Sequence, residues 1–269
     1  MKALHKYLRT FQMGIQSCME YRVDFLMSIF SSCFILLLQI FLWTAIFRNS
    51  SSPVIYGYTY AQMIAYSLIA GLTAKIVSTG FEWEIQEDIK NGGLNKFIVQ
   101  PIGYFMYRIS SFLGMKALQI LVLIILSFGA LFACSYYLNL SVEVSRILIF
   151  IPFVFLATLL NFLIYYCLSA LAFVMTEVWG VFSAANQGIL MLSGGIFPLD
   201  VFGEGINRIL NLLPFKYLIS YPANIINGRL TMAEIANGAI IQLLWILVLF
   251  VTANRVWVWG LKKYVAAGG

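Results

Sequence analysis

Charged residues are scarce in this sequence. Only 10% of its 269 residues are Asp, Glu, Lys or Arg, whereas 61% are hydrophobic. Soluble domains carry roughly 25% charged residues, and a water-soluble core has no room for so much apolar surface. The composition therefore predicts an integral membrane protein. Because the loops between the hydrophobic runs are short, we expect one membrane domain over residues 1–269 and no separate soluble domain.

The motifs of nucleotide, metal and nucleophile chemistry are also lacking. No Gly-x-x-x-x-Gly-Lys-Ser/Thr phosphate loop occurs, so we do not expect this chain to bind ATP in that way. No His-Glu-x-x-His motif or Cys/His cluster indicates a metal, and no Gly-x-Ser-x-Gly elbow indicates a serine hydrolase. The single histidine, His5, lies among lysines and is expected at the surface. We predict that the chain is not an enzyme and holds no cofactor or metal of its own.

Ionisable residues are missing from the centres of the hydrophobic runs. Intramembrane Asp, Glu, His or Lys residues mark proton or ion relays, so their absence argues against an ion-coupled carrier or a channel. It argues equally against a membrane-embedded lipid-modifying enzyme, which would need clustered polar groups. These two classes remain the alternatives. The polar residues that the runs do contain, expected mostly to tie helices together by hydrogen bonds, are Gln39, Gln62, Gln119, Asn161, Asn186, Gln187 and Gln242.

Six long uncharged runs are present instead, each able to supply the roughly 20 residues of a membrane span. They predict an all-α fold with spans at about 25–47, 58–79, 112–135, 147–172, 178–196 and 235–256. The fifth is the weakest, because Asn186, Gln187 and Ser193-Gly194-Gly195 interrupt it. Before the first span, residues 1–22 combine basic residues with a one-face apolar pattern, which predicts an amphipathic helix in the membrane interface.

Lysine and arginine predict the orientation. Six spans put both termini on one side, and basic residues are enriched on the cytoplasmic side of membrane proteins. With the termini in the cytoplasm, that side would hold Lys2, Lys6, Arg9, Arg22, Lys75, Lys90, Lys96, Arg108, Lys116, Arg255, Lys262 and Lys263, out of 17 basic residues in all. This distribution accounts for the net charge of +6 without nucleic acid. We expect a multi-pass protein of a bacterial cell membrane, in contact with the lipid bilayer.

Residues 82–101, between the second and third spans, are unusually polar. They hold four of the eleven acidic residues, namely Glu82, Glu84, Glu87 and Asp88. We expect a short helix that ends at Asn91-Gly92-Gly93, because glycine accepts the left-handed backbone of a helix end. Leu94, Phe97 and Ile98 predict a second short helix, closed by Pro101. The stretch is either an ordinary polar loop or a docking surface for a soluble partner.

Residues 196–233, on the other side of the membrane, are apolar but broken. Three short pieces end at Pro214, Pro222 and Gly228, and none is long enough to cross the bilayer. Broken segments occur at membrane depth only when they are buried in protein or line a cavity. We favour re-entrant half-helices over a loop that lies on the surface.

Taken in order, these features resemble the permease subunits of the ABC-2 type exporter family. Residues 88–101 are similar to the family pattern I-x-x-G-x-L-x-x-x-L-x-x-P, with Ile98 in place of the second leucine. Residues 192–199 with Pro214 and Pro222 are similar to the family's outward re-entrant region, and residues 260–269 to its ending. Each motif is weak alone, but their order covers nearly the whole chain. The branch resembled contains compact permeases that often work as unlike pairs beside one ATPase.

The resemblance implies an exporter subunit that forms a dimer with a second permease, the same or homologous. Two ABC ATPase subunits, which bind ATP and Mg, would dock beneath the dimer on residues 82–98, the coupling helix. The cargo would be an amphipathic peptide, an antibiotic or drug, or a lipid-linked glycan. The residues expected to couple to the ATPase are Glu82, Trp83, Glu84, Ile85, Glu87, Asp88, Ile89, Leu94, Phe97 and Glu177. The residues expected to form an outer gate are Phe197, Pro198, Pro214, Phe215 and Pro222.

Particular roles follow within the coupling set. The acidic side chains would present charge to the ATPase, while Trp83, Ile85 and Ile89 would supply apolar anchors. Glu177 belongs to the short link 176–180, which would make a smaller second contact.

Overall fold

The computed structural model describes residues 2–100, 102–138, 143–175 and 177–264. Pro101, Thr176 and residues 265–269, which the sequence assigned to a helix end, a link and the terminal motif, lie outside the described residues. The first half contains α1 (Lys2–Glu20), α2 (Arg22–Arg48), β1 (Val54–Ile55), β2 (Tyr58–Thr59), α3 (Tyr60–Val77), α4 (Phe81–Lys90), α5 (Asn95–Val99) and α6 (Tyr104–Leu138). The second half contains α7 (Val144–Ser169), η1 (Ala170–Phe173), α8 (Trp179–Leu192), η2 (Leu199–Phe202), α9 (Gly203–Leu210), η3 (Phe215–Tyr217), α10 (Ser220–Ile226) and α11 (Met232–Leu261).

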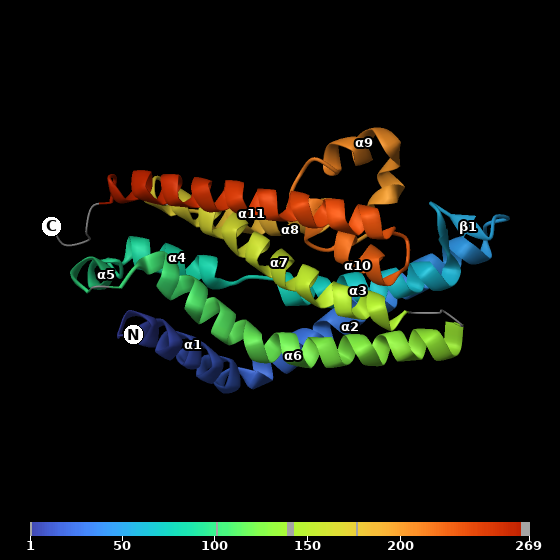
Figure 1. The fold of residues 1–269 in the computed structure, drawn as a ribbon, viewed down its shortest axis with the longest axis horizontal. Helices are drawn as coiled ribbons and strands as arrows, with labels where there is room; N and C mark the ends of the chain where they lie inside the picture. The colour runs from blue at the N-terminus through green and yellow to red at the C-terminus, as the bar shows by residue number, and fades with distance from the viewer. Residues whose placement is uncertain (1, 101, 139–142, 176, 265–269) are drawn as a thin grey trace.

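The long helices form a bundle whose two ends differ (Figure 1). Both chain termini lie at one end together with α4 and α5, and we call this the terminal end. The hairpin of β1 and β2 lies at the other end, and α9 and α10 lie toward it; we call this the opposite end. The sequence placed the same segments on opposite sides of a membrane, and the fold separates them along its long axis.

Five stretches of the described chain are helical, long and apolar enough to cross a membrane. They are Leu26–Arg48, Tyr60–Lys90, Tyr104–Gly129, Val144–Phe173 and Met232–Leu261. The predicted span 178–196 corresponds to α8, which has 14 residues. At 1.5 Å per residue α8 is about 21 Å long, shorter than the roughly 30 Å hydrocarbon core. The described chain is thus an all-helical membrane fold with five full-length candidate spans and one shorter helix.

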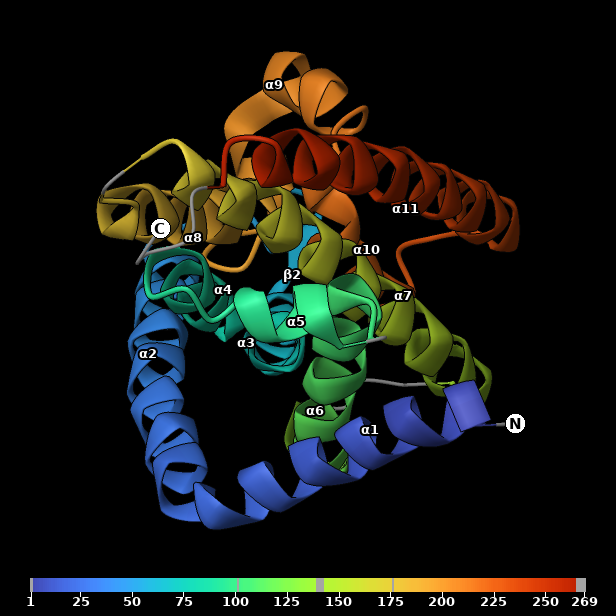
Figure 2. The same ribbon diagram turned by 90° about the vertical axis from the view of Figure 1, so that its left-hand side faces the viewer.

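The N-terminal helix α1 packs along α6 at the terminal end (Figures 1 and 2). The crossing is close because both helices contribute a glycine. A Cβ on Gly14 would clash with the Ser111 carbonyl oxygen, and one on Gly114 would clash with the Phe11 carbonyl oxygen. Among residues 5–20 of α1, the buried ones are all small, namely Thr10, Gly14 and Cys18. The predicted amphipathic helix is present, and its small face, rather than its apolar face, holds it to the bundle.

Two buried apolar clusters fill the bundle. The larger lies among α3, α7 and α10 and includes Tyr66, Leu160 and Ile225. The second lies at the terminal end, where α4, α6, α7 and α11 meet, and includes Phe162 and Trp257. The second cluster therefore underlies the polar stretch that the sequence singled out.

Hydrogen bonds from span residues hold neighbouring helices together, as predicted. Gln39 donates to the Ile196 carbonyl oxygen at 3.0 Å, and Asn161 donates to the Val77 carbonyl oxygen at 2.7 Å. Gln242 lies 3.3 Å from the Phe153 oxygen and 3.2 Å from the Tyr217 oxygen. Each amide meets a backbone carbonyl of a different segment, so these side chains act as internal ties.

Candidate functional site

The element between α3 and α6 consists of two short helices, α4 and α5, joined by a glycine turn. Acidic residues occupy the first turn of α4 and Lys90 its last turn, which suits the helix dipole at both ends. Gly92 has a φ of +74°, the left-handed conformation that ends the helix. A Cβ on Gly93 would clash with the Asp88 carboxylate, so the turn also needs this second glycine. The predicted pair of short helices with a glycine hinge is confirmed.

The inner face of α4 packs into the second buried cluster rather than facing solvent. The Phe81 ring lies 4.6 Å from the Phe162 ring of α7 and 5.3 Å from the Phe112 ring of α6. Ile85 is fully buried, and Ile89 is 7% exposed. A ten-residue helix is marginal without tertiary packing, and these residues supply that packing.

Several predicted contact residues are therefore placed differently from the expectation. Ile85, Ile89 and Leu94 were expected among the residues that meet a partner, but all three are buried within this chain. Glu82, expected to present charge to the ATPase, is also buried, at 7% exposed. The physical reason is that α4 must bury one face to remain attached to the bundle, and these positions lie on that face.

A buried arginine fastens α4 to α6. The Arg108 side chain is 6% exposed, and its guanidinium pairs with both Glu84 and Asp88 of α4. Its Nε donates to the Tyr104 hydroxyl at 2.9 Å, and that hydroxyl donates to Asp88 Oδ2 at 2.8 Å. Lys96 Nζ adds a contact of 3.5 Å to Asp88 Oδ1. A buried guanidinium needs such partners because an uncompensated charge in the interior is costly.

Sequence reasoning missed Arg108. It lies twenty-four residues after Glu84 along the chain, and local helix periodicity cannot connect positions on different helices. The only available signal was the presence of a basic residue near the start of an apolar run. Of the acidic residues predicted to face a partner, Asp88 and in part Glu84 are instead used within the chain.

The outer face of α4 remains exposed at the terminal end. Trp83, Glu84, Glu87 and Asn91 are exposed and share this face. In Figure 2, which looks onto the terminal end, α4 and α5 lie in the middle, with α1, α2, α8 and α11 around them. The Trp83 ring meets Phe182 of α8 with ring centroids 5.1 Å apart. The exposed surface thus combines an aromatic edge with acidic and amide groups.

Two more predicted contact residues lie beside this surface. Phe97 of α5 is half-buried, with its ring centroid 4.8 Å from both Tyr104 and Tyr107. Glu177 follows the turn after η1, and its Oε1 lies 3.9 Å from Lys90 Nζ at the end of α4. The Glu177 side chain is 82% exposed. The tertiary structure thus places the link that contains Glu177 next to α4, and both predicted contacts lie at the terminal end.

The segment that follows α8 has irregular backbone whose carbonyl groups are bonded by other elements. The Tyr66 hydroxyl donates to the Gly194 oxygen at 2.8 Å, and the Ser220 backbone N–H donates to the Ser193 oxygen at 2.8 Å. Gly194 has a φ of +81°, and a Cβ there would lie 2.6 Å from the Tyr66 hydroxyl. Backbone of this kind is tolerated at membrane depth only when its polar groups are satisfied in this way.

The predicted outer-gate residues lie in and around this segment. All seven residues of α10, including Pro222, are buried, and α10 packs against α3 and α7. Pro198 and Pro214 are buried, and Phe197 lies edge-on to Trp43 of α2 at 6.4 Å. Phe215 is half-buried against the larger core cluster. The pieces that form η3 and α10 are therefore enclosed by the protein. The first predicted piece forms α9 and lies on the surface instead, with Ile206 50% and Ile209 62% exposed, because only Leu210 of this helix is buried.

The family of the chain follows from a comparison with known proteins. A family model described as ABC-2 family transporter protein matches residues 33–268. The chain belongs to this family. An ABC-2 permease is the membrane component of a transporter and is not itself catalytic. A comparison with curated proteins gave no match.

A polar cluster closes the opposite end of the permease. Arg229 Nη1 lies 3.0 Å from Asp200 Oδ2, and its guanidinium carbon lies 3.7 Å from the centre of the Tyr58 ring. The Tyr58 hydroxyl oxygen is 3.0 Å from Asp200 Oδ2 and 3.0 Å from Asn224 Oδ1. Gly57, with a φ of +78°, leaves room for the arginine. The cluster joins the hairpin, η2, α10 and the turn before α11.

A hydrophilic cavity of about 190 Å³ adjoins this cluster in the permease. Asn207, Asn211 and Lys216 contribute to its lining. Burial lowers the pKa of the Lys216 ammonium, while Asp200 and Glu234 act in the opposite direction. Within the described residues, no three His, Cys, Asp or Glu side chains are grouped to hold a metal ion.

Proposed function

We propose that the permease is the membrane subunit of an ATP-powered exporter and that α4 and α5 couple it to a separate ABC ATPase. The observation that carries this proposal is the pairing of Arg108 with Glu84 and Asp88 beneath an exposed helix face. A loop with no mechanical role has no need of a buried ionic attachment to a membrane span. A helix that receives force from a partner does need one.

The same packing gives a route for movement from α4 into the bundle. Arg108 connects α4 to α6, and Phe81 connects it to Phe162 of α7. The Tyr104 ring is stacked on Trp257 of α11 at 4.9 Å, which extends the connection to the last span. Closure of an ATPase pair on ATP and Mg would displace α4, and these contacts would tilt the spans together.

The proposed orientation places the terminal end in the cytoplasm, with both termini inside. Six crossings are then needed. The short helix α8 would complete the sixth together with the broken segment that follows it. The burial of all of α10 within the protein supports this placement, because broken segments at membrane depth must be enclosed. The enclosed pieces around Phe197 and Phe215 would form the outer gate. The setting is a bacterial cell membrane, as the distribution of basic residues suggests.

A second permease, the same or homologous, would pack against the face of α8. Asn186 and Gln187 are exposed on this helix. The Asn186 Oδ1 accepts a bond from the Tyr165 hydroxyl at 3.3 Å, but both amides keep exposed polar groups. Exposed amides are costly in hydrocarbon, so we place them toward a partner permease and a shared path. The cargo would be amphipathic, such as a peptide, an antibiotic or drug, or a lipid-linked glycan.

The test is co-purification of the ATPase with variants of the exposed face of α4. Trp83→Ala combined with Glu87→Lys alters this face without touching Arg108, and we expect it to release the ATPase. Glu204→Lys is the matched control, since Glu204 is exposed on α9 toward the opposite end. If the double variant retains the ATPase at the wild-type ratio, the coupling surface is not on α4.

A further inference from the structure

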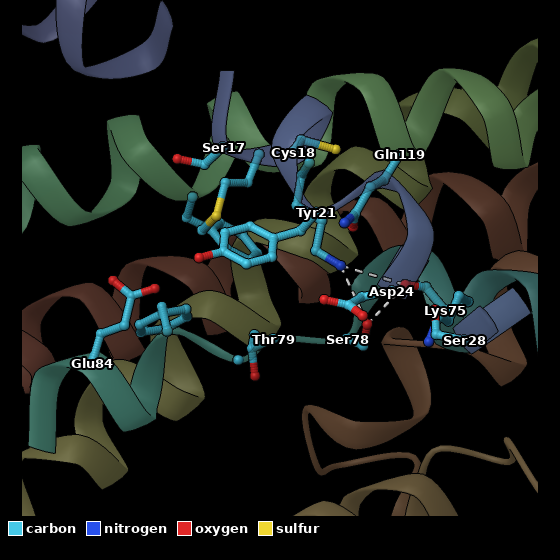
Figure 3. A pocket seen from close by; sticks show the side chains of 15 residues that line it. Ser17, Cys18, Tyr21, Asp24, Ser28, Lys75, Ser78, Thr79, Glu84 and Gln119 are labelled. Atoms are coloured by element: carbon cyan, nitrogen blue, oxygen red, sulfur yellow. Dashed lines mark hydrogen bonds between the residues drawn. The ribbon is translucent and has the colours of Figure 1, made fainter. Parts of the chain in front are cut away.

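A cavity of about 380 Å³ lies at the terminal end, under the elbow where α1 turns into α2. Figure 3 shows its lining side chains. They come from the end of α1, the first turns of α2, the joint between α3 and α4, and the middle of α6. Ser17, Tyr21 and Gln119 contribute polar groups, and Phe112 and Met115 contribute apolar walls. The cavity is therefore amphipathic, and three spans share it.

Two lysines in this lining have no carboxylate partner. Lys116 is only 7% exposed, and its Nζ is held 3.2 Å from Ser78 Oγ and 3.4 Å from the Lys75 carbonyl oxygen; the dashed lines in Figure 3 mark both bonds. Neither lysine forms an ion pair within the described parts of the chain. A buried ammonium without a counter-charge is unfavourable, so the site favours an anion.

The charged residues around the cavity also indicate where the hydrocarbon core of the membrane ends. Asp24, Lys75 and Lys116 are the residues that bound the uncharged runs 25–47, 49–74 and 117–142 on the terminal side. All three line the cavity. The boundary of the hydrocarbon thus passes through it. Asp24 and Glu84 are the carboxylates of the lining, and Glu84 is already paired with Arg108.

The apolar surface next to the cavity continues toward the opposite end. Ser28 of α2 and Gln119 of α6 line the cavity. Two helical turns farther on, the same faces carry Ile35 and Leu126, which are 57% and 42% exposed. A ligand with a phosphate in the cavity can therefore place hydrocarbon chains along α2 and α6.

We propose that this cavity binds the phosphate group of a phospholipid from the membrane leaflet at the terminal end. Lys116 and Lys75 hold the phosphate, and the acyl chains follow the apolar faces of α2 and α6. Asp24 and Tyr21 meet the hydroxyl or amine groups of the headgroup. Because Thr79, Gly80 and Phe81 belong to the lining, the bound lipid braces the joint between α3 and the proposed coupling helix.

Native mass spectrometry of the purified permease with phosphatidylglycerol tests this proposal. We expect one tightly retained lipid per chain, and about a tenfold loss of affinity for each of Lys75→Gln and Lys116→Gln, because each removes a charge-assisted contact. Lys262→Gln is the control, since Lys262 is an exposed lysine at the same end, outside the cavity. Equal retention by wild type and Lys75→Gln would overturn the proposal.

Two competitors of phosphatidylglycerol test whether the site recognises a lipid phosphate, a soluble phosphate or only acyl chains. Glycerol phosphate carries the phosphate without acyl chains, and diacylglycerol carries the chains without the phosphate. We expect neither to displace phosphatidylglycerol at concentrations where unlabelled phosphatidylglycerol does. Displacement by glycerol phosphate would indicate a site for soluble anions, and displacement by diacylglycerol would show that the phosphate is not recognised; either result contradicts the proposal.

The lipid-binding test remains decisive if one variant misfolds, and it does not depend on coupling to the ATPase. If Lys116→Gln does not give a monodisperse protein, Lys75→Gln decides, because only the backbone oxygen of Lys75 contacts Lys116. The measurement uses the permease alone and needs no ATPase. Failure of the lipid site would thus leave the proposed coupling intact, and the reverse also holds.

Discussion

The two ends of the permease are stabilised by different kinds of contact. At the terminal end, α4 is held by the guanidinium of Arg108 and two carboxylates, with its other face exposed. Toward the opposite end, α10 is enclosed. The neutral side chains of Tyr66 and Gln39 donate to carbonyl oxygens of the irregular segment after α8, and Arg146 donates to the Ile225 oxygen of α10.

The difference follows from backbone chemistry. A helix satisfies its own backbone groups, so α4 can keep one face exposed and needs only a firm lateral attachment. Irregular backbone cannot satisfy itself and must be enclosed when it lies at membrane depth. The ion pairs of Arg108 would keep α4 attached to α6 while α4 moves. The hydrogen bonds to the segment after α8 would keep that segment in place.

The largest effect is expected from breaking the ionic attachment at the terminal end. Arg108→Met removes the buried cation from the Asp88 carboxylate, whose side chain is 12% exposed, and leaves it only the longer contact to the exposed Lys96 and the bond from the Tyr104 hydroxyl. Removing one partner of a buried pair typically costs about 3–5 kcal/mol. We expect a strongly lowered melting temperature and faster proteolysis near Gly92. Arg255→Met, an exposed arginine on α11, is the control; a similar loss in both variants would refute a specific role for Arg108.

A smaller effect is expected from the neutral network. Tyr66→Phe removes the bond to the Gly194 oxygen and leaves a buried carbonyl unsatisfied, at a cost of about 1–2 kcal/mol. The measurement is the thermal unfolding midpoint in detergent. Tyr136→Phe, at an exposed tyrosine of α6, should change nothing. A Tyr66→Phe variant with an unchanged unfolding midpoint would show that the segment after α8 is held by packing alone.

The ion pair of the opposite end tests whether burial, rather than charge, sets the difference. Arg229 and Asp200 have side chains that are 24% and 40% exposed, whereas those of Arg108 and Asp88 are 6% and 12% exposed. Arg229→Met should cost about 1 kcal/mol, and the loss should shrink at high salt because exposed pairs are screened. Thermal unfolding at two salt concentrations measures this. A salt-independent loss as large as that of Arg108→Met would erase the contrast between the ends.

The smallest effect is expected at an exposed helix start. Glu143 lies 3.4 Å from Arg146 one turn later in the same segment, and Glu143→Gln should cost only about 0.3 kcal/mol. The shift in melting temperature should be near the limit of detection. A shift as large as that of Arg229→Met would mean that Arg146, whose Nη1 also donates to the Leu230 oxygen at 3.0 Å, depends on Glu143 for its position.

The sequence by itself determined the membrane class, five of the six predicted apolar spans and the two-helix element with its glycine hinge. Composition and the spacing of hydrophobic residues are properties of short stretches of sequence. The uncharged runs and Asn91-Gly92-Gly93 were therefore sufficient for these predictions. It also indicated that Gln39, Asn161 and Gln242 tie helices together, because amides in apolar helices need partners.

Only the tertiary structure decided which faces are buried and which charges meet. Ile85 and Ile89 were predicted to anchor a partner and Leu94 to couple to it, but all three are buried in the core of the bundle. Arg108 and Lys116 carry the same charge on the same helix, yet one meets two carboxylates and the other meets none. Neither outcome follows from local pattern, because it depends on how distant helices pack, and packing sets both burial and the energy of a charge.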